Sequence, residues 1–130
     1  MVADNGRVYV FYDYNGDGFK CPGRSDCVGW FVYKYSDDHG RTWSQERYRL
    51  PMRMTAVDRT NTFDGKVQIF WGIGKPITFN GTMMFAFSKC GKYLIDRSEG
   101  WFYRSNNILT ETDPAKIEWQ LLPDGDVGLK

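Results

Sequence analysis

The sequence predicts an all-β protein built from antiparallel strands. Aromatic residues make up 17% of its 130 residues and there are 14 glycines, a composition that favours turn-rich sheets over helices. Three dipeptides, Asn5-Gly6, Asp64-Gly65 and Asn80-Gly81, are typical of tight hairpin turns. Short runs of aromatic and β-branched residues, such as Val8–Tyr12 and Val28–Tyr35, indicate the strands between such turns.

The expected elements follow one another along the whole chain. After the first two runs, β-like segments are predicted at Glu46–Leu50, Met52–Thr62, Lys66–Trp71, Ile77–Phe79, Thr82–Phe87, Gly100–Arg104 and Gln120–Pro123. The segment Thr112–Lys116 is expected to hold one helical turn capped by Thr112, because Pro114 suits the first turn of a helix. Asp13–Cys27 is expected to be a polar loop.

Several short motifs occur twice in the same order. Gly29-Trp30-Phe31 returns as Gly100-Trp101-Phe102, and Leu50-Pro51 returns as Leu122-Pro123. The stretch from Ser36 to Trp43 has a looser echo, with an insertion, in Ser105, Asn107 and Trp119. Repeated β elements in a constant order are typical of stacked architectures such as propeller blades.

This repeat divides the chain into unequal parts. We predict an incomplete blade at residues 1–51, a whole blade at 52–123, and the start of a further one at 124–130. Two blades would leave unpaired sheet edges and an unshielded face. The expectation is therefore a fragment of a longer chain, or a unit that assembles into an oligomer through its open edges.

The overall composition excludes several classes of partner. The net charge is +1, which gives no electrostatic case for nucleic acid or an anionic membrane. No apolar run is long enough to span a bilayer, and no signal peptide is visible, so the compartment is not assigned. Of three cysteines, Cys21 and Cys27 can pair if the protein is exported, while Cys90 is left over. The sparse, odd set fits a reducing compartment equally well.

Metal and cofactor chemistry has little support in the sequence. The single His39 is expected to be an exposed turn residue, and no zinc spacing occurs. Asp13–Gly18 matches the start of a calcium-binding loop, but Arg24 stands where the twelfth-position Glu is needed. A plain polar loop is the preferred interpretation there, and no cofactor or metal is predicted.

The stretch Ser36–Trp43 has the features of a structured turn. Asp38 can accept backbone N–H bonds, Gly40 can adopt positive φ, and Ser36 and Thr42 offer short hydroxyls. Trp43 is expected to fold back as a mostly buried apolar plug. The pattern Ser-x-Asp-x-Gly-x-Thr-Trp resembles the Asp-box (BNR repeat) of sialidases and related six-bladed β-propellers. The alternative is an ordinary glycine-containing hairpin loop.

The resemblance extends to Arg49-Leu50-Pro51, Gly74-Lys75-Pro76 and Ser98–Ser105. It implies about two blades of a sialidase-like propeller, with the Asp-box between the third and fourth strands of a blade, on the face away from the active site. The implied function is part of a glycoside hydrolase of the exo-sialidase type, acting on acidic glycans. The alternatives are a non-catalytic propeller that binds carbohydrate or protein, and a structural fragment without activity.

The same resemblance nominates site residues on the face opposite Ser36–Trp43. In that family arginines bind the substrate carboxylate, an Asp is the acid/base and a Tyr paired with a Glu is the nucleophile. No Tyr–Glu pair can be assigned here. The catalytic candidates are Asp26 and Asp58. The substrate-binding candidates are Arg24, Arg53, Arg59, Asn61, Lys75 and Glu99. For each of them the alternative is a solvated loop residue or a structural ion pair.

Overall fold

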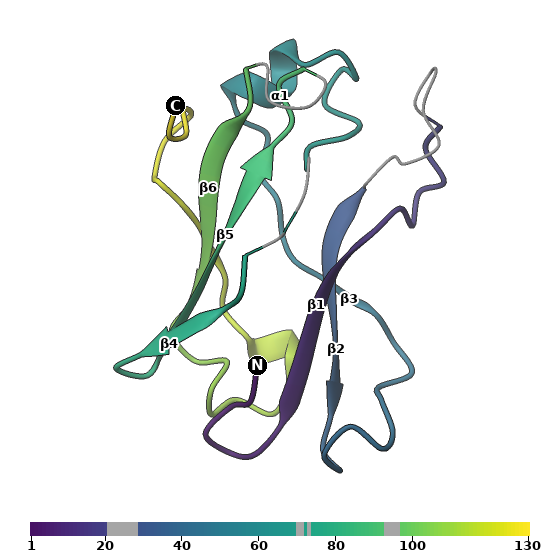
Figure 1. Cartoon of the computed structure of the whole chain (residues 1–130), viewed down its shortest axis with the longest axis vertical. Coiled ribbons are helices and arrows are strands. Elements are labelled where there is room, and N and C mark those ends of the chain that lie inside the picture. Colours follow the sequence, from purple (N-terminus) through teal and green to yellow (C-terminus); the bar gives the residue numbers. More distant parts are fainter. Residues whose placement is uncertain (21–28, 70–71, 73, 93–96) are drawn as a thin grey trace.

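The computed structural model describes residues 1–20, 29–69, 72, 74–92 and 97–130. Seven strands and one short α-helix occur within these residues, and every strand pair is antiparallel (Figure 1). The predicted all-β class is therefore confirmed. The elements are β1 (Val8–Tyr14), β2 (Trp30–Ser36), β3 (Tyr48–Arg49), α1 (Ala56–Thr60), β4 (Ile77–Phe79), β5 (Thr82–Lys89), β6 (Glu99–Ser105), the 3-10 turn η1 (Pro114–Lys116) and β7 (Gln120–Leu122).

The strands form two separate open sheets. Sheet A has the order β1-β2-β3 and sheet B the order β4-β5-β6-β7, so each strand lies beside the next one along the chain. The pairing is continuous through the centre of each sheet: Tyr12 lies opposite Val32, and Val32 opposite Arg49. Neither sheet closes on itself. Each is thus a meander, in which strands that follow one another along the chain are neighbours in the sheet.

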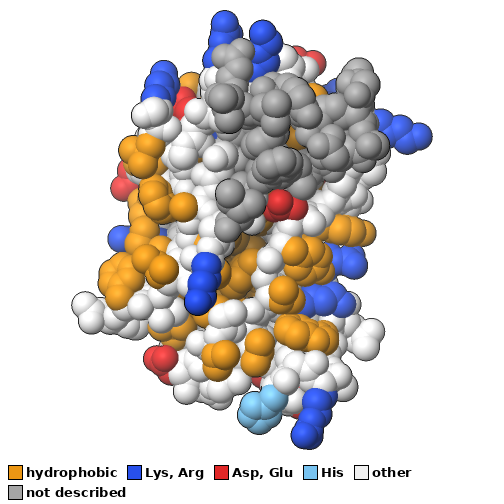
Figure 2. Space-filling model, in the orientation of Figure 1, with side chains coloured by type: hydrophobic (Ala, Val, Ile, Leu, Met, Phe, Trp, Pro, Cys, Tyr) orange, Lys and Arg blue, Asp and Glu red, His pale blue; other side chains and the backbone are white. Residues whose placement is uncertain are grey.

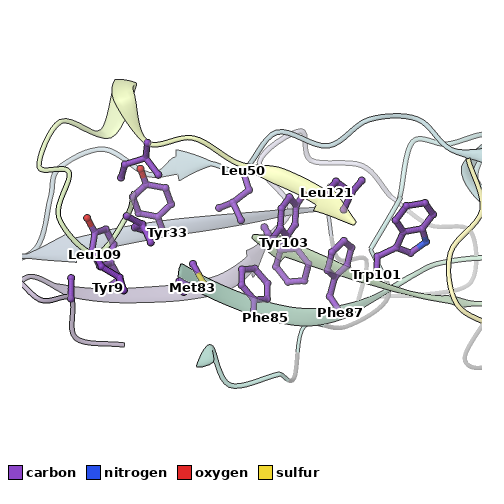
Figure 3. Packing of buried hydrophobic residues seen from close by; sticks show 14 of the residues in the cluster. Tyr9, Tyr33, Leu50, Met83, Phe85, Phe87, Trp101, Tyr103, Leu109 and Leu121 are labelled. Atoms are coloured by element: carbon purple, nitrogen blue, oxygen red, sulfur yellow. The ribbon is translucent and has the colours of Figure 1, made fainter. Parts of the chain in front are cut away.

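The inner faces of the two sheets pack against each other and form one core (Figure 3). Phe31 of sheet A is central, because its ring lies 5.0 Å from that of Phe87 and 5.5 Å from that of Phe85, both in β5. Tyr103 of β6 stacks on Phe87 from the same side, at 4.9 Å. In β5 and β6 every second side chain is buried and points toward the core, as the two-residue period of a strand requires. The two sheets therefore share a hydrophobic core.

Two of the predicted tight turns join or extend strands. Asn80 and Gly81, between β4 and β5, have φ values of 46° and 74°, the positive values that a type I′ turn needs. Gly6 has φ 86° in the turn that returns the N-terminal residues to β1. The φ values of Asp64 and Gly65 are also positive, at 50° and 71°. This third turn follows a helix, so it does not connect two strands.

The structure corrects three local predictions. The segment Met52–Thr62, expected to be β-like, contains α1, because the Asp58 side chain accepts the backbone N–H of Thr55 and closes the helix start. Lys66–Trp71 makes only one described bridge, at Ile69, and Phe70 and Trp71 lie outside the described residues. The predicted turn near Pro114 is present, but its cap is Asp113, which accepts the Ala115 N–H at 3.0 Å.

Candidate functional site

The candidate residues separate into two ends of the molecule. Strand β2 runs down to the turn at Ser36, whereas α1 lies beyond the opposite ends of the sheets (Figure 1). We call these the turn end and the α1 end. Asp58 and Arg59 belong to α1, and Glu99 begins β6 opposite Lys89 at the same end. Arg24 and Asp26, together with Cys21 and Cys27, lie outside the described residues.

The Ser36–Trp43 turn is closed by its own side chains. The Ser36 hydroxyl accepts the Gly40 N–H at 2.8 Å and donates to Asp38 Oδ1 at 2.7 Å. Asp38 in turn accepts the Thr42 N–H at 2.8 Å and the Thr42 hydroxyl at 2.7 Å. Chiefly because the Thr42 backbone N–H bonds the charged form, the pKa of Asp38 falls to about 2. The predicted capping role of Asp38 is therefore confirmed.

A turn of the same design follows β6. Strand β6 ends at Ser105 as β2 ends at Ser36, and the Ser105 hydroxyl accepts the Ile108 N–H at 3.2 Å. Asn107 takes the position of Asp38, because its Oδ1 accepts the Glu118 N–H at 2.9 Å while its Nδ2 donates to the Lys116 carbonyl. The chain then returns as β7. The loose sequence echo thus corresponds to a shared hydrogen-bonding scheme.

The two tryptophans of this repeat differ in burial. Trp43 is 38% exposed, so the expectation of a mostly buried plug is not met. Its ring lies next to Gly40, where an added Cβ would be 3.8 Å from Cζ2. Trp119 packs instead on the shared core, 6.0 Å from the Tyr33 ring and 6.1 Å from the Phe11 ring. The reason is position: Trp119 precedes β7 beside the intersheet core, whereas Trp43 lies at the outer margin of sheet A.

Replacing Ser36 with alanine is expected to destabilise the fold by about 1–3 kcal/mol, because the Gly40 N–H loses its acceptor beside a buried strand end. Urea unfolding followed by tryptophan fluorescence measures the change. Alanine in place of exposed Thr62 is the control and should change stability by less than about 0.5 kcal/mol. Equal effects of the two changes would contradict the role given to the Ser36 hydroxyl.

Asp58, a candidate catalytic residue, lies in a buried ion pair. Its side chain and that of Lys89 are both 0% exposed, and Lys89 Nζ donates to Asp58 Oδ2 at 2.5 Å. The same oxygen accepts the N–H and the hydroxyl of Thr55, each at 2.8 Å. Oδ1 is buried without a hydrogen-bond partner among the described residues. Asp58 is therefore closed to a substrate in this structure, and its catalytic assignment stays a prediction.

Lys89 is the residue of this end that the sequence interpretation overlooked. Its ammonium donates three bonds, to Asp58, to the Thr55 hydroxyl at 3.1 Å and to the Arg53 carbonyl at 2.8 Å. Burial lowers the pKa of Lys89, and the Asp58 carboxylate partly opposes that shift. The sequence did indicate that Lys89 is buried, because it lies two residues beyond Phe87 on the same side of β5. The other buried residues on that side are Met83, Phe85 and Phe87.

Two of the three candidate arginines, Arg53 and Arg59, lie in the described part of the chain, and both have structural partners. The Arg53 guanidinium donates to the carbonyls of Leu121, Pro123 and Gly125 at 2.7–2.8 Å, which ties the segment before α1 to the C-terminal segment. Arg59 is half-exposed and pairs with Asp126. Of these two described candidates, Arg59 is the one whose guanidinium is exposed to solvent and can exchange its carboxylate partner for another anion.

The remaining candidates have different surroundings. Asn61 is buried, and its amide bonds the Val67 carbonyl and the N–H groups of Phe63 and Gly65, so it holds the turn after α1. Glu99 is 5% exposed and accepts the Gly128 N–H at 2.8 Å through Oε2. Lys75 is exposed and lies before β4, away from the α1 cluster.

A cavity of about 510 Å³ lies beside α1 and Glu99. Its lining is mostly apolar, with charged groups at the start of β6 and at the C-terminus. The lining includes Ala56, Val57, Thr60, Glu99, Val127 and Lys130. Glu99 is therefore the one substrate-binding candidate, among the described residues, that lines this space. A cavity of this size and character suits a small amphipathic molecule.

The described acidic and amide side chains of the calcium-like loop bond other groups of the protein. Asp13 accepts the Gly72 N–H, and burial raises the pKa of its carboxyl group. Asn15 bonds the backbone of Phe19 with both side-chain atoms, and Asp17 accepts the Trp30 indole N–H. Within the described ranges no group of three or more His, Cys, Asp or Glu side chains is arranged to hold a metal ion. No helix among those same residues is long and apolar enough to cross a membrane.

In comparisons with known proteins, no family model, no curated protein and no solved structure matches the chain. The functional assignment therefore rests on the residues of this chain and on their geometry.

Proposed function

We propose that the chain forms part of a sialidase-like, Asp-box β-propeller that acts on acidic glycans, with sheets A and B as an incomplete and a complete blade. The observation that carries the proposal is the pair of serine-centred turns. In sheet B the second of these turns lies between the third and fourth strands, β6 and β7, which is the place an Asp-box takes in a blade. In sheet A the first one lies between the last two strands.

The α1 end then corresponds to the glycan-facing side. It lies opposite the serine-centred turns and contains the cavity that Glu99 lines. The exposed Arg59 guanidinium lies at the same end but does not line that cavity. Arginine suits a sugar carboxylate because its planar fork donates two parallel hydrogen bonds. We propose that these described residues contribute to binding, while the acid and nucleophile of the hydrolase come from elsewhere in the propeller.

A non-catalytic carbohydrate- or protein-binding propeller is the second candidate. It is favoured by the state of the described carboxylates: Asp58 is completely buried against Lys89, and Glu99 is buried against the Gly128 N–H. Glycosidic cleavage needs two carboxyl groups, or an equivalent pair, at a fixed separation across one bond. Asp58 and Glu99, the two candidate carboxylates among the described residues, are both buried and cannot serve as an accessible pair in this structure.

The purified 130-residue chain is expected to release no fluorophore from a 4-methylumbelliferyl sialoside, because two sheets supply only part of the required centre. The Asp26→Asn variant is the control, since Asp26 is the predicted catalytic residue that lies outside the described part. Robust turnover by the unmodified chain that is lost in this variant would establish the fragment itself as an enzyme.

Binding separates the two candidate functions from a purely structural fragment. Saturation-transfer NMR with N-acetylneuraminic acid is expected to show binding that weakens several-fold in the Arg59→Ala variant. Galactose, which lacks the carboxylate, serves as the matched neutral ligand. Equal signals for the two sugars would contradict recognition of acidic glycans.

A further inference from the structure

The cavity beside α1 contains a buried carboxylate with one oxygen that the protein does not use. Glu99 lines this cavity of about 510 Å³ and is only 5% exposed. Its Oε2 accepts the Gly128 N–H at 2.8 Å. Among the described residues Oε1 accepts no hydrogen bond, and unlike Asp58 Oδ1 it is not completely enclosed. Oε1 can therefore accept a hydrogen bond from a molecule in the cavity.

The backbone around Glu99 fixes the position of this carboxylate. Glu99 begins β6 on the inward side of the strand, two residues before the fully buried Trp101. Gly128 is held beside it because Leu129 exchanges two backbone hydrogen bonds with Gly100, at 2.8 and 3.0 Å. A Cβ on Gly128 would lie 2.3 Å from Trp101 Nε1, so this segment packs directly on the indole. A ligand therefore meets a preformed acceptor.

No cation of the described residues neutralises Glu99 by direct contact. Lys89 lies opposite Glu99 in the strand register. Its ammonium has three N–H donors, and these bond Arg53, Thr55 and Asp58 instead. None of the ion pairs among the described residues includes Glu99. Because a buried charge is normally paired, a cation from outside the chain would complete this site.

The rest of the lining suits a cation with an apolar body. Ala56, Val57 and Val127 supply aliphatic surface. Thr60 adds a second acceptor, because its hydroxyl donates its one proton to the Ala56 carbonyl at 3.1 Å and leaves the oxygen to accept. An apolar wall with two hydrogen-bond acceptors favours a molecule that combines hydrocarbon with N–H donors.

Two basic side chains, Arg97 and Lys130, also line the cavity, and both are exposed to solvent. Basic side chains are prominent on the surface at the α1 end, at the top of Figure 2. Water and salt screen exposed charges of this kind, whereas the enclosed carboxylate of Glu99 is screened much less. We therefore expect Glu99 to select the charge of a group inside the cavity, and the two exposed cations to tolerate a neutral or anionic far end.

We propose that this cavity binds a small organic ammonium ion. Its N–H groups lie toward Glu99 Oε1 and the Thr60 hydroxyl, and its hydrocarbon part lies against Val57 and Val127. The ligand class is an amine with an aromatic or branched aliphatic body. The inference goes beyond the proposed action on glycans, because it requires neither a sugar nor Arg59, which does not line the cavity.

Three probes of similar shape test which charge the cavity selects. Benzylamine, benzyl alcohol and benzoate share one ring and carry a cationic, a neutral and an anionic group. Backbone amide NMR shifts of the isotopically labelled 130-residue chain report binding. Benzylamine is expected to give saturable shifts at Ala56, Val57 and Thr60. Benzyl alcohol should bind about tenfold more weakly, the usual effect of losing a charge-assisted hydrogen bond, and benzoate should give no saturable shifts.

The other outcomes of this comparison would overturn the proposal. Tightest binding by benzoate would show that Arg97 and Lys130 select the ligand. Equal binding of the three probes would show that only the apolar lining matters. Absence of saturable shifts with benzylamine would exclude the site altogether.

A variant that keeps the shape of Glu99 tests its charge. In Glu99→Gln the amide oxygen can still accept the Gly128 N–H, and the affinity for benzylamine should fall about tenfold. Asp124→Asn removes the same charge from an exposed residue of the C-terminal segment and should leave the affinity unchanged. Unchanged affinity in Glu99→Gln, with circular dichroism showing that its sheets are retained, would contradict the proposal. If this variant does not fold, the three probes on the unmodified chain decide. Loss of sialic acid binding in Arg59→Ala is a separate result, so the two proposals can fail independently.

Discussion

Replacing Asp58 with alanine is expected to lower the free energy of unfolding by about 3–5 kcal/mol, the usual cost of removing one partner of a buried ion pair. The Lys89 ammonium would stay in the interior with only the Thr55 hydroxyl and the Arg53 carbonyl as acceptors. Chemical denaturation at pH 7 measures the effect. Arg59→Ala, which breaks the exposed pair with Asp126, is the matched control and should cost about 1 kcal/mol or less.

The loss in Asp58→Ala should shrink as the pH is raised towards 10.5, the ordinary pKa of lysine. Asp58 raises the pKa of Lys89, so its removal leaves burial as the main influence and lowers that pKa further. Between the lowered folded value and the unfolded value, the unfolded chain binds more protons, and stability therefore rises with pH. A destabilisation that is the same at pH 7 and pH 10 would argue against a buried charge. The double variant Asp58→Ala, Lys89→Met should recover most of the loss.

Replacing Phe31 with alanine is expected to cost about 3–5 kcal/mol, because its ring fills the centre of the contact between the sheets. The ring is in contact distance of Phe85, Phe87 and Tyr103, all in sheet B. The site is tightly packed, since a Cβ on Gly72 would lie 2.0 Å from a Phe31 ring carbon. Thermal and denaturant unfolding of the variant measure the change.

Trp43→Ala is the matched aromatic control for this experiment. Its side chain is 38% exposed, so deletion removes less buried surface and should cost about 1 kcal/mol. Similar losses at Phe31 and Trp43 would show that the intersheet contact is not the main source of stability. Two separate unfolding transitions in the unmodified chain would show the same, because a shared core predicts one transition.

The sequence predicted the strands best where local chemistry determines them. Hairpin dipeptides and alternating aromatic runs located β4, β5 and the turn between them, because positive φ at Asn80 and Gly81 is a local requirement. The prediction that Met52–Thr62 is β-like is wrong for the part that forms α1. The hydrophobic residues around Thr55, Ala56 and Val57 do not recur with the spacing typical of a helix. The helix there depends on the carboxylate of Asp58, which in turn depends on Lys89 in another strand.

The candidate site was less predictable for the same physical reason. Charged loop residues look alike in a sequence, whether they face solvent or bond the backbone. Arg53 was expected to bind substrate, and it bonds three carbonyls that lie 68 to 72 residues away. Asn61 was also expected to bind substrate, but its side chain bonds the backbone of the turn after α1. Only a three-dimensional arrangement separates these roles, because the partners are backbone groups without a sequence signature.

The contacts of Arg53 also affect the order in which the chain folds. Its bonds to Leu121 and Gly125 close loops of 68 and 72 residues, whereas β4 and β5 are joined by the tight turn at Asn80 and Gly81. Closing a long loop costs more entropy, so we expect these bonds to form after the β4–β5 hairpin. Interactions that form late act mainly on the rate of unfolding. We therefore expect the Arg53 hydrogen bonds to the C-terminal segment to slow unfolding of the chain and to leave its folding rate nearly unchanged.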